Sequence, residues 1–232
     1  MHNSLQNQKI FIVGGSSGLG FAVAKLASTL GAQVIIGSRT AAVKHQELTA
    51  AIGNSIETYS FDATSEDETA TTLKNIGNID HLVITVRPEI TPAPFADTDP
   101  RLAREAFETK FWGQYQLIRQ AQCQISANGS IVMTTGIAGE KIFKNLSTMA
   151  IINNATETLC RSLAVELAPI RVNVVSPGFV APKVKEVEGY AQQFPLQRLA
   201  APKEIAETYI YLMLSAYTTG TTLVIDGGAR LV

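Results

Sequence analysis

The sequence is poor in the residues that form disulfide frameworks, metal sites and nucleic-acid surfaces. Its 232 residues include two cysteines and three histidines, and 19 Lys and Arg residues nearly balance 20 Asp and Glu residues. Cys123 and Cys160 are far apart, and Cys160 lies in a helical pattern, so we expect core thiols in a reducing compartment rather than a disulfide. With a net charge of -1, the protein lacks the positive electrostatic potential that would attract the phosphate backbone of a nucleic acid. We therefore expect no nucleic-acid partner.

The sequence also lacks the long apolar runs of a membrane protein. No stretch is long enough to cross a bilayer, and Met1 to Leu5 contain no basic end leading into an apolar core. His2, His45 and His81 have no ligand spacing, so we expect no metal site. Because 46% of the residues are hydrophobic, the chain can bury a substantial core, and we expect a cytoplasmic globular protein without a membrane partner.

Apolar runs rich in Ile and Val alternate with helix-length periodic stretches along the whole chain. Seven buried strands with helical crossovers predict an α/β fold with a parallel sheet and helices on both faces. No linker or repeat divides residues 1–232, so they are read as a single domain. The predicted strands are Lys9–Val13, Gln33–Ile36, Ile56–Tyr59, His81–Val86, Ser130–Thr134, Arg171–Val175 and Thr222–Ile225.

A glycine-rich loop, Val13-Gly14-Gly15-Ser16-Ser17-Gly18-Leu19-Gly20, directly follows the first predicted strand and opens a helix. In this context Gly14 can form the tight turn, Gly18 can let the backbone approach a pyrophosphate, and Gly20 can let helix and strand pack closely. The alternative is a plain turn rich in Gly and Ser. The residues expected to bind the cofactor here are Gly14, Ser16, Ser17, Gly18, Leu19 and Gly20.

The ends of the next two strands indicate which dinucleotide the loop holds. Ser38 and Arg39 stand where a carboxylate would grip a free ribose hydroxyl, and they suit a 2′-phosphate instead. This favours NADP(H) over NAD(H), although Arg39 alone could equally be a solvated loop cation. Asp62 ends the third strand and either accepts from the adenine amino group or caps the helix that begins near Ser65. The loop from Arg87 to Pro94 follows a strand's carboxyl end and is expected to border the site.

Landmarks along nearly the whole chain resemble those of the short-chain dehydrogenase/reductase family. The resemblance implies a doubly wound, seven-stranded Rossmann fold, a small-molecule substrate, pyrophosphate binding by the glycine loop, and a nicotinamide end held by Pro177, Gly178 and Val180. Asp62, Ala63 and Thr85 complete the expected cofactor contacts. The landmarks are the glycine loop, Gly31-Ala32-Gln33-Val34, Asp62-Ala63, Asp80-His81-Leu82-Val83, residues 161–168, residues 170–178, Thr219-Gly220 and Asp226-Gly227-Gly228.

The family's usual catalytic group of Asn, Ser, Tyr and Lys is absent at the matching positions. The Tyr lies thirteen residues after the Ser and four before the Lys in the family, and this spacing places Gly136, Met149 and Asn153 there; the Asn position is Lys110. A thioether cannot donate a proton, glycine has no hydroxyl, and an amide carries no charge that would lower a phenol's pKa. The resemblance therefore implies a cofactor but not the usual proton transfer.

Lys110 keeps an enzyme interpretation open. The helix that starts at Asp99-Pro100 and runs to about Gln122 places Lys110 in the middle of its apolar face. Burial there should lower its pKa towards neutrality, where it can act as a general acid or steady an oxyanion. Alternatively, it snorkels to the surface or binds backbone carbonyls. Thr135 is a second catalytic candidate, with an ordinary strand Thr as the alternative.

Two hypotheses therefore stay open. The first is an atypical NADPH-dependent reductase of a small carbonyl or conjugated substrate in which Lys110 replaces the missing Tyr. The second is a regulatory or scaffold protein that binds NADP(H) without hydride transfer. On the other face of the same helix, Trp112 and Tyr115 lie among charges and suggest a partner surface. The resemblance agrees, because the family commonly assembles through this helix, and we expect a homodimer or homotetramer.

Overall fold

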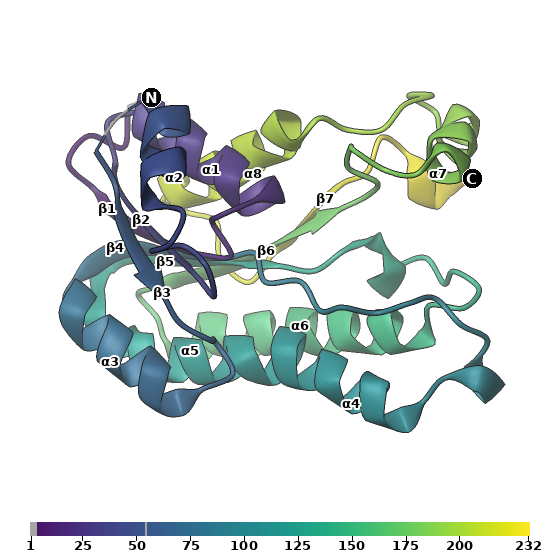
Figure 1. The fold of residues 1–232 in the computed structure, drawn as a ribbon, viewed down its shortest axis with the longest axis horizontal. Helices are drawn as coiled ribbons and strands as arrows, with labels where there is room; N and C mark the ends of the chain where they lie inside the picture. Colours follow the sequence, from purple (N-terminus) through teal and green to yellow (C-terminus); the bar gives the residue numbers. More distant parts are fainter. Residues whose placement is uncertain (1–3, 54) are drawn as a thin grey trace.

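The protein is built on one parallel sheet, seen edge-on in Figure 1. The structure is a computed structural model that describes residues 4–53 and 55–232. Seven strands lie in the order β3-β2-β1-β4-β5-β6-β7, and each neighbouring pair is parallel. The predicted fold class is thus confirmed. The strands are β1 (Lys9–Val13), β2 (Gln33–Ser38), β3 (Glu57–Ser60), β4 (Ile79–Ile84), β5 (Ile125–Thr134), β6 (Arg171–Pro177) and β7 (Thr222–Ile225).

Helices cover both faces of the sheet (Figure 1). One layer contains α1 (Gly18–Thr29), α2 (His45–Ile52) and α8 (Pro202–Leu214). The other contains α3 (Glu66–Ile76), α4 (Pro100–Phe107), α5 (Gly113–Ala121) and α6 (Ser147–Glu166). The short helix α7 (Lys185–Tyr190) lies beyond the sheet, beside the C-terminus. One-turn 3₁₀ helices occupy Phe95–Asp97, Gln122–Gln124, Ile137–Gly139, Ala191–Gln193 and Ala229–Leu231.

Side chains along the strand β1 belong alternately to the two halves of the core, one on each face of the sheet. Ile10 and Ile12 belong to the apolar cluster beneath α1 and α8, whereas Phe11 and Val13 belong to the cluster on the opposite face. Cys160 is buried in the second cluster, as expected for a core thiol, and it is free. Cys123 is also free but exposed, so the expectation of a core position is wrong for it, because it lies in the one-turn helix that follows α5.

The predicted helix from Pro100 to about Gln122 is present but is interrupted. Asp99 caps α4 by accepting from the backbone N–H of Arg101 at 2.8 Å. Between α4 and α5, residues Glu108–Trp112 form a π-helical turn. A π turn inserts one extra residue into the helix and is often found at functional sites. Lys110 lies at its centre.

The described part of the chain lacks two features, a helix that could span a membrane and a cluster of metal ligands. None of its helices is long and apolar enough to span a membrane. Residues 4–53 and 55–232 also contain no group of three or more His, Cys, Asp or Glu side chains arranged to hold a metal ion. His2 lies outside the described residues.

Candidate cofactor and active site

The glycine loop forms the turn from β1 into α1, and its glycines are required for different reasons. Gly14 has φ +86°, and a Cβ there would lie 2.7 Å from the Thr85 hydroxyl. A Cβ on Gly20 would lie 2.5 Å from the carbonyl oxygen of Gly14, so any side chain would force α1 away from the turn. Gly18 has φ +54°, and a Cβ there would meet nothing within 4 Å. The loop is therefore closely packed at Gly14 and Gly20 and open at Gly18.

The N-terminus of α1 fits the diphosphate of a dinucleotide. Ser17 is the N-cap residue, but its side chain makes no capping hydrogen bond, and the first turn contains no acidic residue. The first backbone N–H groups of a helix lack partners within the helix, and the helix dipole adds positive charge there. Together with the open space at Gly18, these groups can bind phosphate oxygens.

The end of β2 offers a hydroxyl and a guanidinium to a further phosphate. Ser38 is the last residue of β2, and its hydroxyl accepts from the backbone N–H of Thr40 at 3.2 Å. The Arg39 side chain is 73% exposed and lies 3.9 Å from the almost fully exposed carboxylate of Glu89. Because such surface ion pairs contribute little free energy, Arg39 remains available to an anionic ligand.

Asp62 was expected either to contact adenine or to cap the following helix, and the structure tests the second of these roles. The helix α3 is capped by Ser65, whose hydroxyl accepts from the N–H of Glu68 at 3.3 Å, so the interpretation of Asp62 as the cap is wrong. Instead, Asp62 accepts from the backbone and hydroxyl of Thr64 at 2.9 and 2.8 Å. This short turn holds the carboxylate beside the end of β3, and its contact with adenine stays a prediction. The neighbouring Ala63 carbonyl accepts from the Gln116 side chain.

The turn after β6 is held rigidly at the same edge of the sheet. Gly178 donates its N–H to the carbonyl of Ile225 at 2.9 Å, and a Cβ on Gly178 would lie 2.8 Å from the Cα of Asp226. Val180 forms a parallel bridge with Ala200. The glycine loop, Thr85 and this turn all lie at the carboxyl ends of parallel strands, which is where such sheets bind ligands.

Lys110 points into the protein and not into solvent. The residue is only 5% exposed. Its ammonium donates to Oδ1 of Asn153 at 2.8 Å and to the carbonyl of Thr135 at 3.2 Å. Burial, followed by repulsion from Arg87, lowers the pKa of Lys110 to about 8. The lysine therefore does not snorkel, but it does bind a backbone carbonyl, as the second alternative anticipated.

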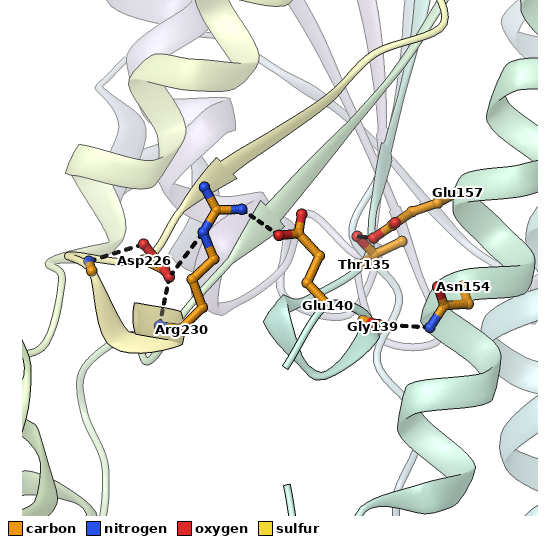
Figure 2. A network of polar contacts seen from close by, with 8 residues as sticks. Thr135, Gly139, Glu140, Asn154, Glu157, Asp226 and Arg230 are labelled. Carbon is orange, nitrogen blue, oxygen red and sulfur yellow. Dashed lines mark hydrogen bonds and ion pairs between the residues drawn. The ribbon is translucent and has the colours of Figure 1, made fainter. Parts of the chain in front are cut away.

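Thr135 links this lysine to a buried carboxylate on α6. The Thr135 hydroxyl donates to Oε1 of Glu157 at 3.0 Å (Figure 2). Burial raises the pKa of Glu157, and the hydrogen bond from Thr135 opposes this shift. In turn, the charge of Glu157 raises the pKa of Lys110. Because its single hydroxyl proton is engaged with Glu157, Thr135 cannot donate that proton to a substrate at the same time.

Comparisons with known proteins agree with this geometry. A sequence profile of the family described as enoyl-(acyl carrier protein) reductase matches residues 13–230. A short-chain dehydrogenase/reductase of the fungus Stachybotrys chlorohalonatus is 32% identical, with 98% of this chain and 99% of the relative covered. A solved structure of a short chain dehydrogenase/reductase family protein is 33% identical with a TM-score of 0.90, covering 99% of this chain and 100% of that one. This chain belongs to the short-chain dehydrogenase/reductase family.

Members of this family bind NAD(P)H. Another solved structure, a small-chain dehydrogenase in complex with NADPH, is 27% identical with a TM-score of 0.83 and covers 98% of this chain and 100% of that chain. The geometry of the glycine loop and the family membership together favour cofactor binding by residues 14–20 over a plain turn rich in Gly and Ser.

Lys110 and Asn153 are hydrogen-bonded to each other. The resemblance described above predicts the family's Asn at position 110 and its Lys at position 153, so an exchange of these two residue types is an expectation from that spacing. The Asn153 amide also donates to the carbonyl of Gly136 at 2.9 Å. The ammonium in this cluster is thus carried by the π turn that precedes α5.

Gly136, the position at which the resemblance predicts the family's Ser, is not crowded. A Cβ on Gly136 would have ordinary contacts with the Asn153 amide nitrogen at 3.5 Å and the Pro177 carbonyl at 3.7 Å. Gly136 has φ 164°, an extended conformation open to any residue. Met149 is half-buried in the first turn of α6. Nothing in the surrounding structure explains why Gly136 and Met149 stand at these positions.

The loop that follows β5 is fixed from both sides. Asn154 on α6 donates to the carbonyl of Gly139 at 2.7 Å, and Arg230 in the C-terminal turn pairs with Glu140 (Figure 2). Lys141 donates to the carbonyl of Ala229 at 3.1 Å. These contacts tie the loop next to Thr135 to α6 and to the C-terminus.

A cavity of about 740 Å³ opens beside this loop. Residues of the loop after β4 line it, among them Arg87 and Thr91, and further lining comes from Asn145 to Thr148. That this loop borders the cofactor and substrate site stays a prediction. Sequence reasoning missed Glu157 as a partner of the catalytic candidates. Its spacing of four residues from Asn153 on α6 was the available signal, because such residues share one face of a helix.

Proposed function

We propose that this protein is an atypical NADPH-dependent reductase of a small carbonyl or conjugated substrate, with Lys110 in place of the family's Tyr. One observation carries the proposal: an ammonium buried beside the cofactor-binding edge of the sheet, held by Asn153 and Thr135, with its pKa lowered to about 8. Strongly perturbed pKa values are concentrated at functional sites.

The arrangement gives Lys110 one N–H for a substrate. An ammonium has three N–H donors, and two of them are used by Asn153 and Thr135. The bound cofactor supplies the hydride. Lys110 then steadies the oxygen on which negative charge develops and gives it a proton, a transfer favoured by a donor whose pKa lies near the working pH.

Several observations support NADPH as the reductant. Arg39 and Ser38 lie at the end of β2, Arg39 has only a weak surface ion pair, and no acidic residue replaces them. The solved relative that holds NADPH has the same fold over 98% of this chain. Arg39→Ala should therefore weaken NADPH binding about tenfold or more and leave NADH binding nearly unchanged, because it removes a charge-assisted hydrogen bond to the 2′-phosphate.

A second candidate is an NADP(H)-binding regulatory or scaffold protein without hydride transfer. The positions of the family's Ser and Tyr are Gly136 and Met149, neither of which can transfer a proton. In addition, two of Lys110's hydrogen bonds already go to the protein, as in a purely structural network. The enzyme is favoured because burial of a lysine charge is costly, and a charge retained at such a cost is typical of functional sites.

Binding and turnover measured separately distinguish the two candidates. NADPH and NADH are titrated by fluorescence, and NADPH consumption is then followed over aldehydes, ketones, enones and imines. We expect NADPH binding and turnover of one substrate class, with Lys110→Met retaining binding and losing turnover. Tight binding without turnover on every class would favour the regulatory protein. Failure to bind either nucleotide would contradict both candidates.

We also propose a homodimer or homotetramer that assembles through α4, α5 and α6. Trp112 and Tyr115 are 48% and 42% exposed, and their rings pack against each other with centroids 5.6 Å apart. Beside them lies an apolar groove of about 670 Å³ lined by residues of α6, including Ile151, Ala155 and Leu159. Exposed aromatic and aliphatic side chains in one patch are typical of a protein interface.

A further inference from the structure

The short turn that follows β3 is held by hydrogen bonds from its own segment of the chain. The Asp62 N–H donates to the carboxylate of Glu68 at 2.9 Å, and the Asp62 carbonyl accepts from the Ser65 N–H at 3.0 Å. The Thr64 N–H donates to Oδ1 of Asp62 at 2.9 Å. Because the Asp62 carbonyl and the Ala63 N–H belong to one planar peptide unit, these contacts also set the direction of that N–H.

Gln116 holds the next peptide unit of the turn from a different element. It is buried on α5, 53 residues further along the chain, and its side-chain amide donates to the Ala63 carbonyl. A Cβ on Gly113, in the first turn of the same helix, would lie 3.5 Å from that carbonyl oxygen, so α5 packs directly against the turn. Since a packed helix is less mobile than a connecting segment, Gln116 ties the turn to a fixed support.

Two neighbouring groups of the turn have no partner among residues 4–53 and 55–232. The Ala63 N–H makes no hydrogen bond, and both contacts from Thr64 to the Asp62 carboxylate use Oδ1, which leaves Oδ2 open. Asp62 and Ala63 are half-buried, so a ligand can reach them. The turn therefore presents a hydrogen-bond donor beside an acceptor.

This donor and acceptor match the edge of a 6-aminopurine. In adenine the ring nitrogen N1 accepts a hydrogen bond and the 6-amino group donates one, whereas hypoxanthine has a donor at N1 and an acceptor at position 6. The turn also adjoins the strand end that is expected to bind the 2′-phosphate, because the Phe61 N–H donates to the Ser38 carbonyl at 3.1 Å. The two places that one adenosine 2′-phosphate would occupy are thus neighbours.

We propose that Gln116 is a positioning residue for the adenine of the cofactor and makes the site selective for a 6-aminopurine over a 6-oxopurine. By holding the Ala63 carbonyl, it keeps the Ala63 N–H and the Asp62 carboxylate aligned with the two groups of the base. A 6-oxopurine would set donor against donor and acceptor against acceptor, and polar groups left unpaired in this way are costly. This deepens the proposed function and rests on NADPH as the cofactor.

The test compares NADPH with its hypoxanthine analogue, in which a 6-oxo group replaces the 6-amino group. Both dinucleotides are titrated by fluorescence into the wild-type protein and into Gln116→Met, whose thioether cannot donate a hydrogen bond. We expect the wild-type protein to bind NADPH about tenfold or more tightly than the analogue, and Gln116→Met to bind the two within about threefold of each other. Both affinities come from the same preparation, so a loss of folded protein does not change their ratio.

Gln120 provides a matched control on the same helix. Its side-chain amide also donates to a backbone carbonyl, that of Glu66 at 3.3 Å, so Gln120→Met removes a similar contact between α5 and α3. This variant should keep the wild-type preference for NADPH. An equal loss of preference in both variants would indicate a general loosening of α5 and overturn the proposal, as would a Gln116→Met variant that keeps the preference.

The same titrations separate this inference from the proposed reductase. Equal affinity of the wild-type protein for both dinucleotides, together with reduction of a carbonyl substrate by NADPH, would overturn this inference alone. A preference that is lost in Gln116→Met, without reduction of any substrate, would support this inference and contradict the reductase. Binding of neither dinucleotide would contradict both.

Discussion

An ammonium enclosed by protein is stable only when acceptors replace the water it has lost. Lys110 has two such acceptors, the Asn153 amide and the Thr135 carbonyl, and a more distant carboxylate in Glu157. Burial favours the neutral amine, whereas Glu157 favours the ammonium. The balance leaves a proton that is held at neutral pH and released slightly above it, which is the behaviour required of a general acid.

The pH dependence of the reductase should follow this lysine. Because its pKa is lowered to about 8, the ammonium predominates below pH 8 and is lost as the pH rises through that value. We therefore expect kcat/KM for carbonyl reduction to fall above about pH 8. Steady-state rates at saturating NADPH measure this profile. Lys110→Met should lower kcat about a hundredfold or more and remove the decline, whereas an unchanged profile in that variant would exclude Lys110 as the acid.

Glu157 should act on the reaction through Lys110. The substitution Glu157→Gln removes the negative charge that raises the pKa of Lys110, so the decline in kcat/KM should move to lower pH. The amide can still accept the Thr135 hydrogen bond, so the fold is preserved. Glu166→Gln, at the exposed end of the same helix, is the control and should leave the profile in place. A loss of rate without a shift in pH would instead indicate a purely structural role.

The turn from β1 into α1 shows how an element sets the position of a binding site. Gly14 and Gly20 bring the start of α1 against Thr85, whose hydroxyl donates to the carbonyl of Val13 at 3.1 Å. Since β1 lies between β2 and β4, the uncapped end of α1 is fixed at the middle of the sheet. Close packing at two glycines thus fixes where a diphosphate can bind.

A methyl group at Gly20 should disrupt this packing. In Gly20→Ala the new Cβ would lie 2.5 Å from the Gly14 carbonyl oxygen, so the turn or the helix must shift. We expect a loss of about 1–3 kcal/mol in the free energy of unfolding, as for other overpacked sites, and an NADPH affinity at least about tenfold weaker. Chemical denaturation and fluorescence titration measure the two effects. Gly189→Ala in α7, where a Cβ would meet nothing within 4 Å, should change neither quantity.

Most elements could be predicted because their patterns are local. β1 and β7 begin and end as predicted, and Lys110 was placed on the buried face by helical periodicity alone. In contrast, β5 begins at Ile125, before the predicted start at Ser130, because Asn128-Gly129 reads as a turn but is accommodated inside the strand. The π turn was also missed, since one inserted residue barely changes a pattern of apolar residues.

The partners in the site depend on contacts between distant segments, and local patterns do not report these. Asn153 was considered only for the charge that it lacks, although its amide holds Lys110, which is 43 residues earlier in the chain. Likewise, Thr135, directly after β5, and Glu157 on α6 are 22 residues apart in the chain, and only the folded structure joins them by a hydrogen bond. The resemblance to the family predicts positions for the site but not the hydrogen bond between Lys110 and Asn153.

The whole molecule uses its two helical layers differently. On the layer with α3 to α6, the ring of Phe111 lies 5.0 Å from that of Trp112 and forms with Tyr115 an aromatic patch at the protein surface. The same layer supplies Lys110 and Glu157, both of which are buried. An interface on the outer side would therefore cover the two helices that hold the proposed acid.

A charge in the middle of the aromatic patch should separate the subunits. In Trp112→Glu a carboxylate would have to lose its water in an apolar contact, which costs several kcal/mol when no cation is present. We expect the wild-type protein to be a dimer or tetramer at micromolar concentration and the variant to be a monomer, as measured by light scattering coupled to size-exclusion chromatography. Val43→Glu, an 88% exposed position between β2 and α2, should keep the wild-type mass. A Trp112→Glu variant that keeps its partners would place the interface on another face.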